Sequence, residues 1–424
     1  MSVIKYWMWL AGMTRLRPRA KSIALEYFGG IEDLFFAGEE ELRRVAGLRA
    51  SEIRCLSEKG MDAAMRALDV CQRENIQIVA LGDSAYPRRL THIYDPPAVL
   101  FVQGKLPAVD EEAAVAAVGT RRASPYGIKM ATRLGYEITK GGGLIVSGLA
   151  EGIDTAAAVG ALRAGGRCVG VLGTAIDTVY PKSNAHLFRD VCAEGAVISE
   201  YPPGTAGSRL NFPARNRIIS GLSVGVLVVE APEKSGALIT AELASEQGRD
   251  VFAVPGNADA DNCIGSNALL RDCAKLTMCG WDVLCEYQGL FPQRIHEISR
   301  AESAIPDEEA ILIQSEHGIK NSAPRPDAAG NFPGLDDPVP QKGVDKEKDL
   351  EYIDLKDQLK DLNETQLKII SAMGEPDMYA DAIIEKTGIP ASEVMMELTM
   401  LQLRGFVTSV GFNQYRLNIK TKRG

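Results

Sequence analysis

Two arginines and an asparagine stand together in the stretch NFPARNRIISGLS, residues 211–223, immediately before the almost wholly apolar run VGVLVVEA. Placing Arg215, Asn216 and Arg217 next to a buried strand costs free energy, because charged and polar side chains lose their hydration when they leave water without a partner. Either these side chains pair with acidic neighbours in the fold, or they face an anion that is not part of the chain. The elements that surround them have to decide between these alternatives.

The composition describes an ordinary globular protein with more than one domain. The chain has 424 residues, 46% of them hydrophobic and 24% charged, and this length favours two or three cores. Because no apolar run reaches about 18 residues and the N-terminus lacks a convincing cleavage site, we expect neither a membrane span nor a secretory signal. The eight cysteines form no C-x-x-C pair, so we expect reduced thiols, no metal site and a cytoplasmic protein.

The acidity of the chain is concentrated in one segment. Residues 302–361 hold 15 acidic and 7 basic side chains, a net charge of −8 out of −9 for the whole chain. The folded domains are therefore close to neutral, and the overall charge says little about what they bind. Because this segment is also rich in proline, we expect a flexible acidic linker over residues 301–358.

The residues between about 75 and 290 predict a doubly wound α/β domain. Eight short valine-rich runs, among them AVAAVG, GLIVSG and VGVLVVEA, alternate for the most part with helical stretches such as YGIKMATRLGYEITKG. Strands that are apolar on both faces and separated by helices are typical of a mostly parallel sheet covered on both sides. The predicted fold is an extended Rossmann-like sheet over residues 73–300.

Smaller domains are expected on either side of this sheet. Residues 1–72 show helical spacing broken by glycines, which predicts a small all-α domain of the SAM or helix-hairpin-helix type. Residues 359–424 predict three helices and a terminal hairpin, the pattern of a winged-helix domain. The third of these helices carries Glu393 and Glu397 and few cations, so a protein partner is as plausible as duplex DNA.

The residues that could do chemistry follow the predicted strands, where doubly wound sheets bind ligands. Small residues there expose main-chain N–H groups, and cations beside them suit phosphate. Taken singly, each position could be a strand corner, a loop brace or a solvated cation, but together they predict a phosphate-binding rim. Its candidates are Gly119, Thr120, Arg121, Ser147, Gly148, Gly152, Lys182, Arg215, Asn216 and Arg217.

Several enzyme classes lack their motifs in this sequence. It contains no G-x-x-x-x-G-K-[ST] loop for a nucleoside triphosphate, no G-x-G-x-x-G turn for a dinucleotide and no G-x-S-x-G nucleophile elbow. The four histidines form no evident catalytic pair. The predicted site therefore holds a ligand rather than cleaving one, and we expect no cofactor.

The motifs at these strand ends resemble the DNA-processing protein A family, also called DprA or Smf. The resemblance rests on AVGTRRASPYG, LIVSGLAEGIDTAAAVGAL, VLGTAIDTVYPKSNAHL, NFPARNRIISGLSVGVLVVEAPEKSGALITAEL and GSNALLRDCAKL, in this order along residues 75–290. The sequence departs from the family at Ala158, where histidine is common, and at Cys273, where glycine is usual. Neither position belongs to the predicted rim.

The resemblance implies a cytoplasmic homodimer that binds single-stranded DNA, protects it and loads RecA recombinase during natural transformation. It implies that Arg121 and Lys182 hold backbone phosphates, and that Phe212 and Tyr180 contact bases. It places the dimer and RecA surface on the helix that carries Ile264, Leu269 and Leu270.

An enzyme on a related fold is the alternative to this interpretation. Related Rossmann-like proteins hydrolyse the glycosidic bond of nucleoside monophosphates with a P-G-G-x-G-T turn and nearby glutamates. The corresponding segment here reads VPGNADADNCIGSN and lacks that turn. We therefore expect a binding protein rather than a phosphoribohydrolase.

Overall fold

A computed structural model describes residues 3–299, 302–303, 364–373, 378–391, 394, 397–398, 401, 406–411 and 414–417. The chain forms two compact units, residues 1–337 and 338–424. Apart from Glu302 and Ser303, the predicted linker over 301–358 lies outside the described residues. The domain boundaries expected from the sequence stay predictions.

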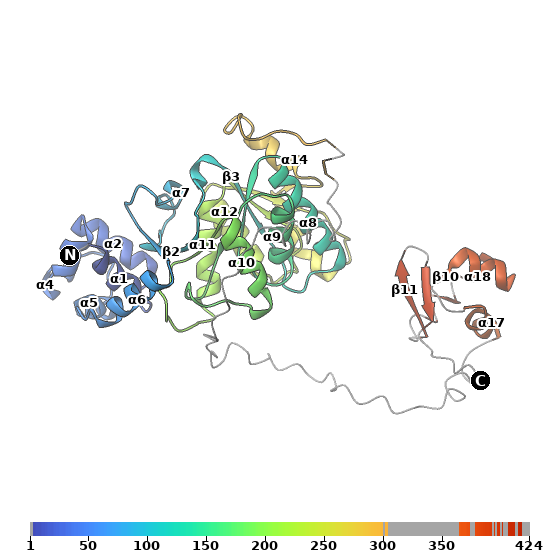
Figure 1. Cartoon of the computed structure of the whole chain (residues 1–424), viewed down its shortest axis with the longest axis horizontal. Helices are drawn as coiled ribbons and strands as arrows, with labels where there is room; N and C mark the ends of the chain where they lie inside the picture. The colour runs from blue at the N-terminus through green and yellow to red at the C-terminus, as the bar shows by residue number, and fades with distance from the viewer. Residues whose placement is uncertain are drawn as a thin grey trace, which may run out of the picture. The chain divides into compact units, whose positions relative to one another are not determined.

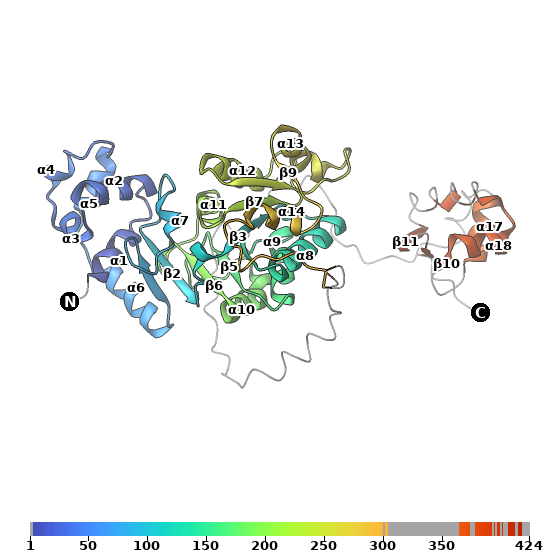
Figure 2. The same cartoon turned by 90° about the horizontal axis from the view of Figure 1, so that it is seen from above.

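The chain begins with six short helices that lie beside one edge of the sheet (Figures 1 and 2). Two glycines separate helices where the sequence predicts it: Gly29 (φ 73°) ends the second helix and Gly47 (φ 92°) precedes the fifth. Both adopt the left-handed conformation that glycine reaches at least cost. The helices are α1 (Ile4–Gly12), α2 (Pro18–Phe28), α3 (Ile31–Phe36), α4 (Glu39–Leu42), α5 (Ala50–Ser57) and α6 (Asp62–Arg73).

A nine-stranded sheet forms the centre of the first unit, in the order β1-β2-β6-β5-β4-β3-β7-β8-β9. The pairs β1–β2 and β2–β6 are antiparallel and all others are parallel, which confirms the mostly parallel α/β fold. The strands are β1 (Gln77–Ala80), β2 (Val99–Gly104), β3 (Ala113–Val118), β4 (Gly143–Ser147), β5 (Cys168–Val171), β6 (Ala196–Ser199), β7 (Gly225–Val228), β8 (Asp250–Ala253) and β9 (Lys275–Leu276).

Helices cover both faces of this sheet, as Figure 2 shows nearly edge-on. Side chains alternate between two cores: in β3, Val115 belongs to the core beneath α8 and α9, whereas Ala116 belongs to the core beneath α11 and α12. This double coverage explains why the strands are apolar on both faces. The helices are α8 (Pro125–Lys140), α9 (Ile153–Arg163) and α10 (Ala185–Glu194) on one face, and α7 (Arg88–Thr91), α11 (Asn211–Leu222) and α12 (Gly236–Glu246) on the other.

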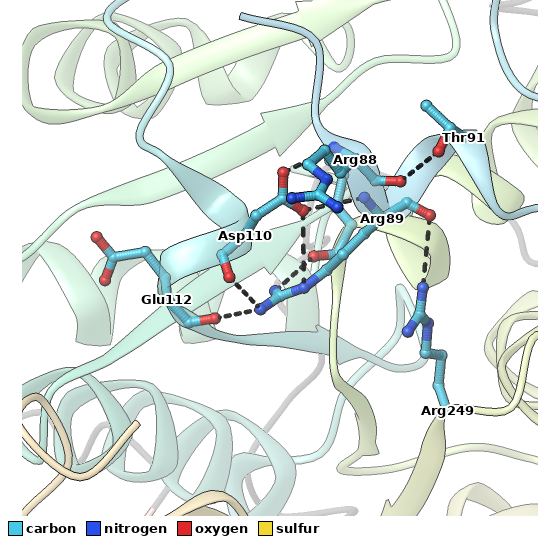
Figure 3. Close-up of polar contacts among 7 residues, drawn as sticks. Arg88, Arg89, Thr91, Asp110, Glu112 and Arg249 are labelled. Atoms are coloured by element: carbon cyan, nitrogen blue, oxygen red, sulfur yellow. Dashed lines mark hydrogen bonds and ion pairs between the residues drawn. The ribbon is translucent and has the colours of Figure 1, made fainter. Parts of the chain in front are cut away.

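A network of hydrogen bonds made by Arg89 and Asp110, called the clasp below, lies at the edge of the sheet from which β3 starts (Figure 3). The Arg89 guanidinium donates to the main-chain oxygens of Leu222 (3.2 Å), Asp110 (3.2 Å) and Glu112 (2.8 Å). In return, the Asp110 carboxylate accepts from the main-chain nitrogens of Arg88 (2.7 Å) and Arg89 (2.9 Å). One side chain thus joins α7, the start of β3 and the end of α11.

The second unit contains two of the three predicted helices and the predicted terminal hairpin of a winged-helix domain. Its three-stranded antiparallel sheet has the order β10-β12-β11, with β10 (Met378–Tyr379), β11 (Val407–Gly411) and β12 (Gln414–Leu417). Helices α17 (Glu364–Ala372) and α18 (Ala380–Thr387) contribute Ile369 and Ile383 to its core. The third predicted helix, near 390–404, falls largely outside the described residues.

Candidate functional site

Two turns meet at the edge where β3 and β4 end, and main-chain contact locks them together. Gly152, at the start of α9, has a φ of 82°. A Cβ atom on it would lie 2.4 Å from the oxygen of Thr120 and 2.7 Å from that of Arg121. Only glycine fits this approach, and the contact fixes the turn that presents the exposed Arg121 side chain.

The turns enclose a pocket with aromatic and cationic walls. The Tyr180 and Phe212 rings lie 5.3 Å apart between centroids, and the Arg121 guanidinium lies 5.4 Å from the centre of the Phe212 ring. Lys182 opens a short 3-10 turn (Lys182–Asn184) next to this wall, and its side chain is exposed. The pocket is lined by Arg121, Gly148, Ala150, Glu151, Leu172, Gly173, Tyr180, Pro181, Phe212 and Arg215.

Arg215 is a buried cation in this pocket. Only 5% of the residue is exposed, and its Nη1 atom donates to the main-chain oxygens of Gly148 (2.8 Å) and Val171. A Cβ atom on Gly148 would lie 2.7 Å from the guanidinium nitrogens, so this glycine leaves the space that the arginine occupies. Its Nε atom is buried without a hydrogen-bond partner among the described residues.

Asp154 is the buried carboxyl group behind Arg215. Its Oδ2 atom accepts from the main-chain nitrogen of Gly148 at 3.1 Å, and 6% of the residue is exposed. Burial raises the pKa of Asp154 to about 6, although the nearby Arg215 acts in the opposite direction. Burial also lowers the pKa of Arg215 to about 10. The two groups are charged together at neutral pH, at some cost to the stability of the fold.

This cost predicts a pH dependence of stability that Asp154→Asn removes. The pKa of Asp154 is higher in the folded chain than its unfolded value of about 4. The contribution of Asp154 to the free energy of unfolding is therefore most favourable below about pH 4, and it is lost as the pH rises through about 6. Urea unfolding should therefore show that the free energy of unfolding of Asp154→Asn rises by about 2–3 kcal/mol relative to that of the wild type between pH 4 and 7.5. Parallel pH profiles for the two proteins would contradict the assignment.

Comparison with known proteins shows the family to which the chain belongs. Residues 77–288 match the family model of the DNA recombination-mediator protein A, and residues 355–411 match the DprA winged helix domain. The Protein Smf of Synechocystis is 31% identical over 95% of this chain and 96% of its own length. The chain belongs to the DNA recombination-mediator protein A family. The family match confirms the resemblance noted in the sequence and the winged-helix prediction.

A solved structure from the DNA recombination-mediator protein A family supports the fold. The crystal structure of DNA processing protein A from Streptococcus pneumoniae matches with a TM-score of 0.58 and 35% identity, covering 68% of this chain and 99% of that one. The DNA processing protein DprA of Streptococcus pneumoniae is 45% identical over 49% of this chain and 72% of its own length.

Arg217 does not line the pocket, and its ion pairs argue against the predicted role as a phosphate ligand. It is 5% exposed and forms ion pairs with Glu200 (2.7 Å) and Asp95 (3.2 Å). A guanidinium already neutralised by two carboxylates has no charge left for a phosphate. Of the two arginines in the ARNR stretch, one thus faces the pocket and the other pairs with acidic neighbours.

Ser147 also has a structural role, because it is fully buried. Its Oγ atom donates to the main-chain oxygen of Asp154 (3.0 Å) and accepts from the main-chain nitrogen of Leu149 (3.2 Å), which argues against the predicted phosphate contact. Thr120 is buried and its Oγ1 atom accepts from the nitrogen of Arg122 (3.2 Å). It shapes the turn, as do Gly119 and Gly152.

Asn216 lies away from the pocket lining. Its side-chain amide donates to the main-chain oxygen of Gly236 at 3.2 Å, toward the start of α12. Whether it contacts a ligand stays a prediction, as do the roles of the other rim residues.

Sequence reasoning missed part of the lining at the end of β5. Leu172 and Gly173 line the pocket, and a Cβ atom on Gly173 would lie 2.8 Å from Cδ1 of Phe212. The glycine that follows the run RCVGVL was the available signal, since close approach of a ring requires a missing side chain. Asn184 was also missed: its amide donates to the Leu149 oxygen (2.9 Å) and ties the Lys182 turn to the pocket.

The predicted dimer surface is partly exposed. Ile264 begins α13 (Ile264–Asp272) and is 41% exposed, whereas Leu269 and Leu270 are half-buried against the core. The neighbouring Leu276 and Met278, at and beyond the edge strand β9, are 51% and 60% exposed. The role of this surface stays a prediction.

Metal sites and membrane spans are both absent from the part of the chain that the structure describes. Within it, no group of three or more His, Cys, Asp or Glu side chains is arranged to hold a metal ion. No helix there is long and apolar enough to cross a membrane.

Proposed function

We propose that this chain is a single-stranded DNA-binding protein that protects incoming DNA and loads RecA recombinase onto it in the cytoplasm. The observation that carries the proposal is the pocket lined by the buried Arg215, the exposed Arg121 and Phe212, whose ring lies beside the Arg121 guanidinium. Cations beside two neighbouring aromatic rings suit a strand whose phosphates and unpaired bases are both accessible. Paired bases of a duplex cannot reach such a ring.

The same pocket supports binding rather than hydrolysis. Cleavage of a glycosidic bond commonly uses two carboxyl groups that flank the bond. Here Asp154 is buried behind Gly148 and hydrogen-bonded to its main-chain nitrogen. Glu151 lines the pocket, but its carboxylate accepts from the Ser183 hydroxyl at 2.9 Å. This arrangement favours a mediator without catalytic activity over a phosphoribohydrolase.

We also propose that the chain acts as a homodimer through the surface around α13. Ile264, Leu276 and Met278 leave apolar area exposed beside β9, the last strand of the sheet. An edge strand with exposed apolar side chains is a ready surface for a second copy. The RecA contact is proposed for the same surface, and the winged-helix domain is left to contact either duplex DNA or a protein.

The test is fluorescence anisotropy with labelled oligo-dT and a matched duplex across a range of salt concentrations. The wild type should prefer the single strand, with an affinity that falls as salt rises by about 0.7 log units per log unit for each neutralised phosphate. The double variant Arg121→Ala/Lys182→Ala should bind at least about tenfold more weakly, with the salt slope reduced by about 1.4.

A matched double variant supplies the control for lost positive charge. Lys105 and Arg54 are cations outside the pocket lining, so Lys105→Ala/Arg54→Ala should retain the wild-type affinity and salt slope. If the wild type fails to bind at low salt, or if both double variants behave alike, the proposal is wrong. Release of ribose 5-phosphate from nucleoside monophosphates would then be the assay of the alternative.

A further inference from the structure

A second hollow lies on the other side of the turn that carries Arg121. Its walls include Ser124, Tyr126, Glu230, Pro255, Asn257 and Asn262. It lies where β3 and its neighbour β7 end; from β3 the chain runs through β4, β5 and β6 on one side, and through β7 and β8 on the other. This reversal of strand order is the position where doubly wound sheets bind ligands.

The phosphate position of this hollow is already filled by the chain itself. The Glu230 carboxylate, with the residue only 1% exposed, accepts from the main-chain nitrogen of Ser124 (2.8 Å) and from its hydroxyl (2.6 Å) at the start of α8. Main-chain N–H groups at a helix start are the usual partners of a bound phosphate. Because Glu230 occupies the N–H and hydroxyl of Ser124 and Asp261 adds negative charge at the rim, this hollow repels an anion.

A neutral, flat ligand with hydrogen-bonding edges fits the remaining walls. The Tyr126 ring is 44% exposed, and its hydroxyl donates to the main-chain oxygen of Pro255 at 2.8 Å, which fixes the ring across the hollow. The exposed amide of Asn257 lies in the same wall. A fixed aromatic face beside an amide is suited to a nucleobase, because every base has a stacking face and polar edges.

The hollow is physically joined to the proposed DNA site. Arg121 and Tyr126 are five residues apart, a span of at most about 18 Å if the chain were fully extended. The side-chain amide of Asn262 donates to the Arg122 main-chain oxygen at 2.9 Å, which holds the far wall of the hollow against this turn. A strand a few nucleotides long can therefore reach from one pocket to the other.

We infer that this hollow is a second nucleotide subsite, in which a base of the bound strand stacks on Tyr126 while its phosphates stay outside. The inference rests on the proposed single-strand binding. It assigns different ligand groups to the two pockets: the first binds phosphate and base, and the second binds a base alone.

The test combines Tyr126→Ala in the full chain with oligo-dT in which one position at a time lacks its base. For the wild type, one abasic position should weaken binding between about fivefold and a hundredfold, the range expected for one stacked base. Tyr126→Ala should weaken binding to intact oligo-dT by the same factor and show no further loss at that abasic position. Tyr126→Phe keeps the ring and should bind within about threefold of the wild type.

Two controls distinguish loss of base stacking from the loss of any exposed tyrosine and from a changed assembly. Tyr27→Ala removes another exposed tyrosine, on α2, and should leave binding unchanged. Light scattering should show the same oligomeric state for the wild type and Tyr126→Ala. The inference is overturned if Tyr126→Ala binds oligo-dT as tightly as the wild type does, or if its oligomeric state changes. It is also overturned if the affinity lost through Tyr126→Ala adds to the affinity lost at every abasic position. A wild type that binds no single strand would instead refute the proposed function.

Discussion

Replacing Arg89 by alanine should lower the free energy of unfolding of the first unit by about 3–5 kcal/mol. The reason is that one partly buried guanidinium donates to three main-chain oxygens, on Leu222, Asp110 and Glu112. Figure 3 shows the contacts with Asp110 and Glu112. A buried acceptor that loses its only donor costs about 1–3 kcal/mol. The side chain is 12% exposed, so water replaces few of these contacts.

Urea unfolding followed by tryptophan fluorescence measures this effect in the right unit. The three tryptophans, Trp7, Trp9 and Trp281, all belong to the first unit. Arg88→Ala is the matched control, because Arg88 is exposed and only its main-chain atoms take part in the clasp. A loss below about 1 kcal/mol for Arg89→Ala, or equal losses for both variants, would show that the clasp does not stabilise the sheet.

The sheet could be predicted because its strands are short apolar runs of one kind. Each of the eight valine-rich runs in the sequence overlaps one strand of the structure, β1 to β8. The ninth strand was missed, because Lys275 and Leu276 form only two residues at the sheet edge and half of the Leu276 surface is exposed. Such a strand is defined by its pairing with β8 rather than by its own pattern.

The pocket was only partly predictable, since distant contacts set the role of each side chain. The order of strands brings the ends of β3, β4 and β5 together, and this order could be anticipated from the fold. By contrast, the burial of Ser147 depends on its hydrogen bonds to Asp154 and Leu149 across a turn. No local pattern in LIVSGLAEG distinguishes a serine that faces a ligand from one that braces its own loop.

Arg215 and Arg217 show the same limit most clearly. They lie two residues apart on α11 and are equally buried, so neither composition nor burial separates them. Their partners do: main-chain oxygens and a pocket for Arg215, and the carboxylates of Glu200 and Asp95 for Arg217. Asp95 lies far from Arg217 in the sequence, and the pairing could not be read from the ARNR stretch.

Substitutions of Arg215 and Arg217 therefore provide a matched test of the proposed DNA site. Arg215→Lys keeps the charge but loses the planar fork that donates to the main-chain oxygens of Gly148 and Val171 at the wall of the pocket. Because a charge-assisted hydrogen bond contributes about 1.5–3 kcal/mol, single-strand affinity should fall between about tenfold and a hundredfold. Arg217→Lys keeps a cation beside Glu200 and should bind within about twofold of the wild type.

Measuring unfolding alongside binding separates the two roles. Both substitutions replace a buried guanidinium, and both should cost about 1–3 kcal/mol of stability, so a merely structural effect would weaken binding equally in the two variants. An affinity loss confined to Arg215→Lys would place the DNA phosphate at Arg215. Equal losses, or a larger loss for Arg217→Lys, would show that α11 acts on the site through its packing rather than through a direct contact.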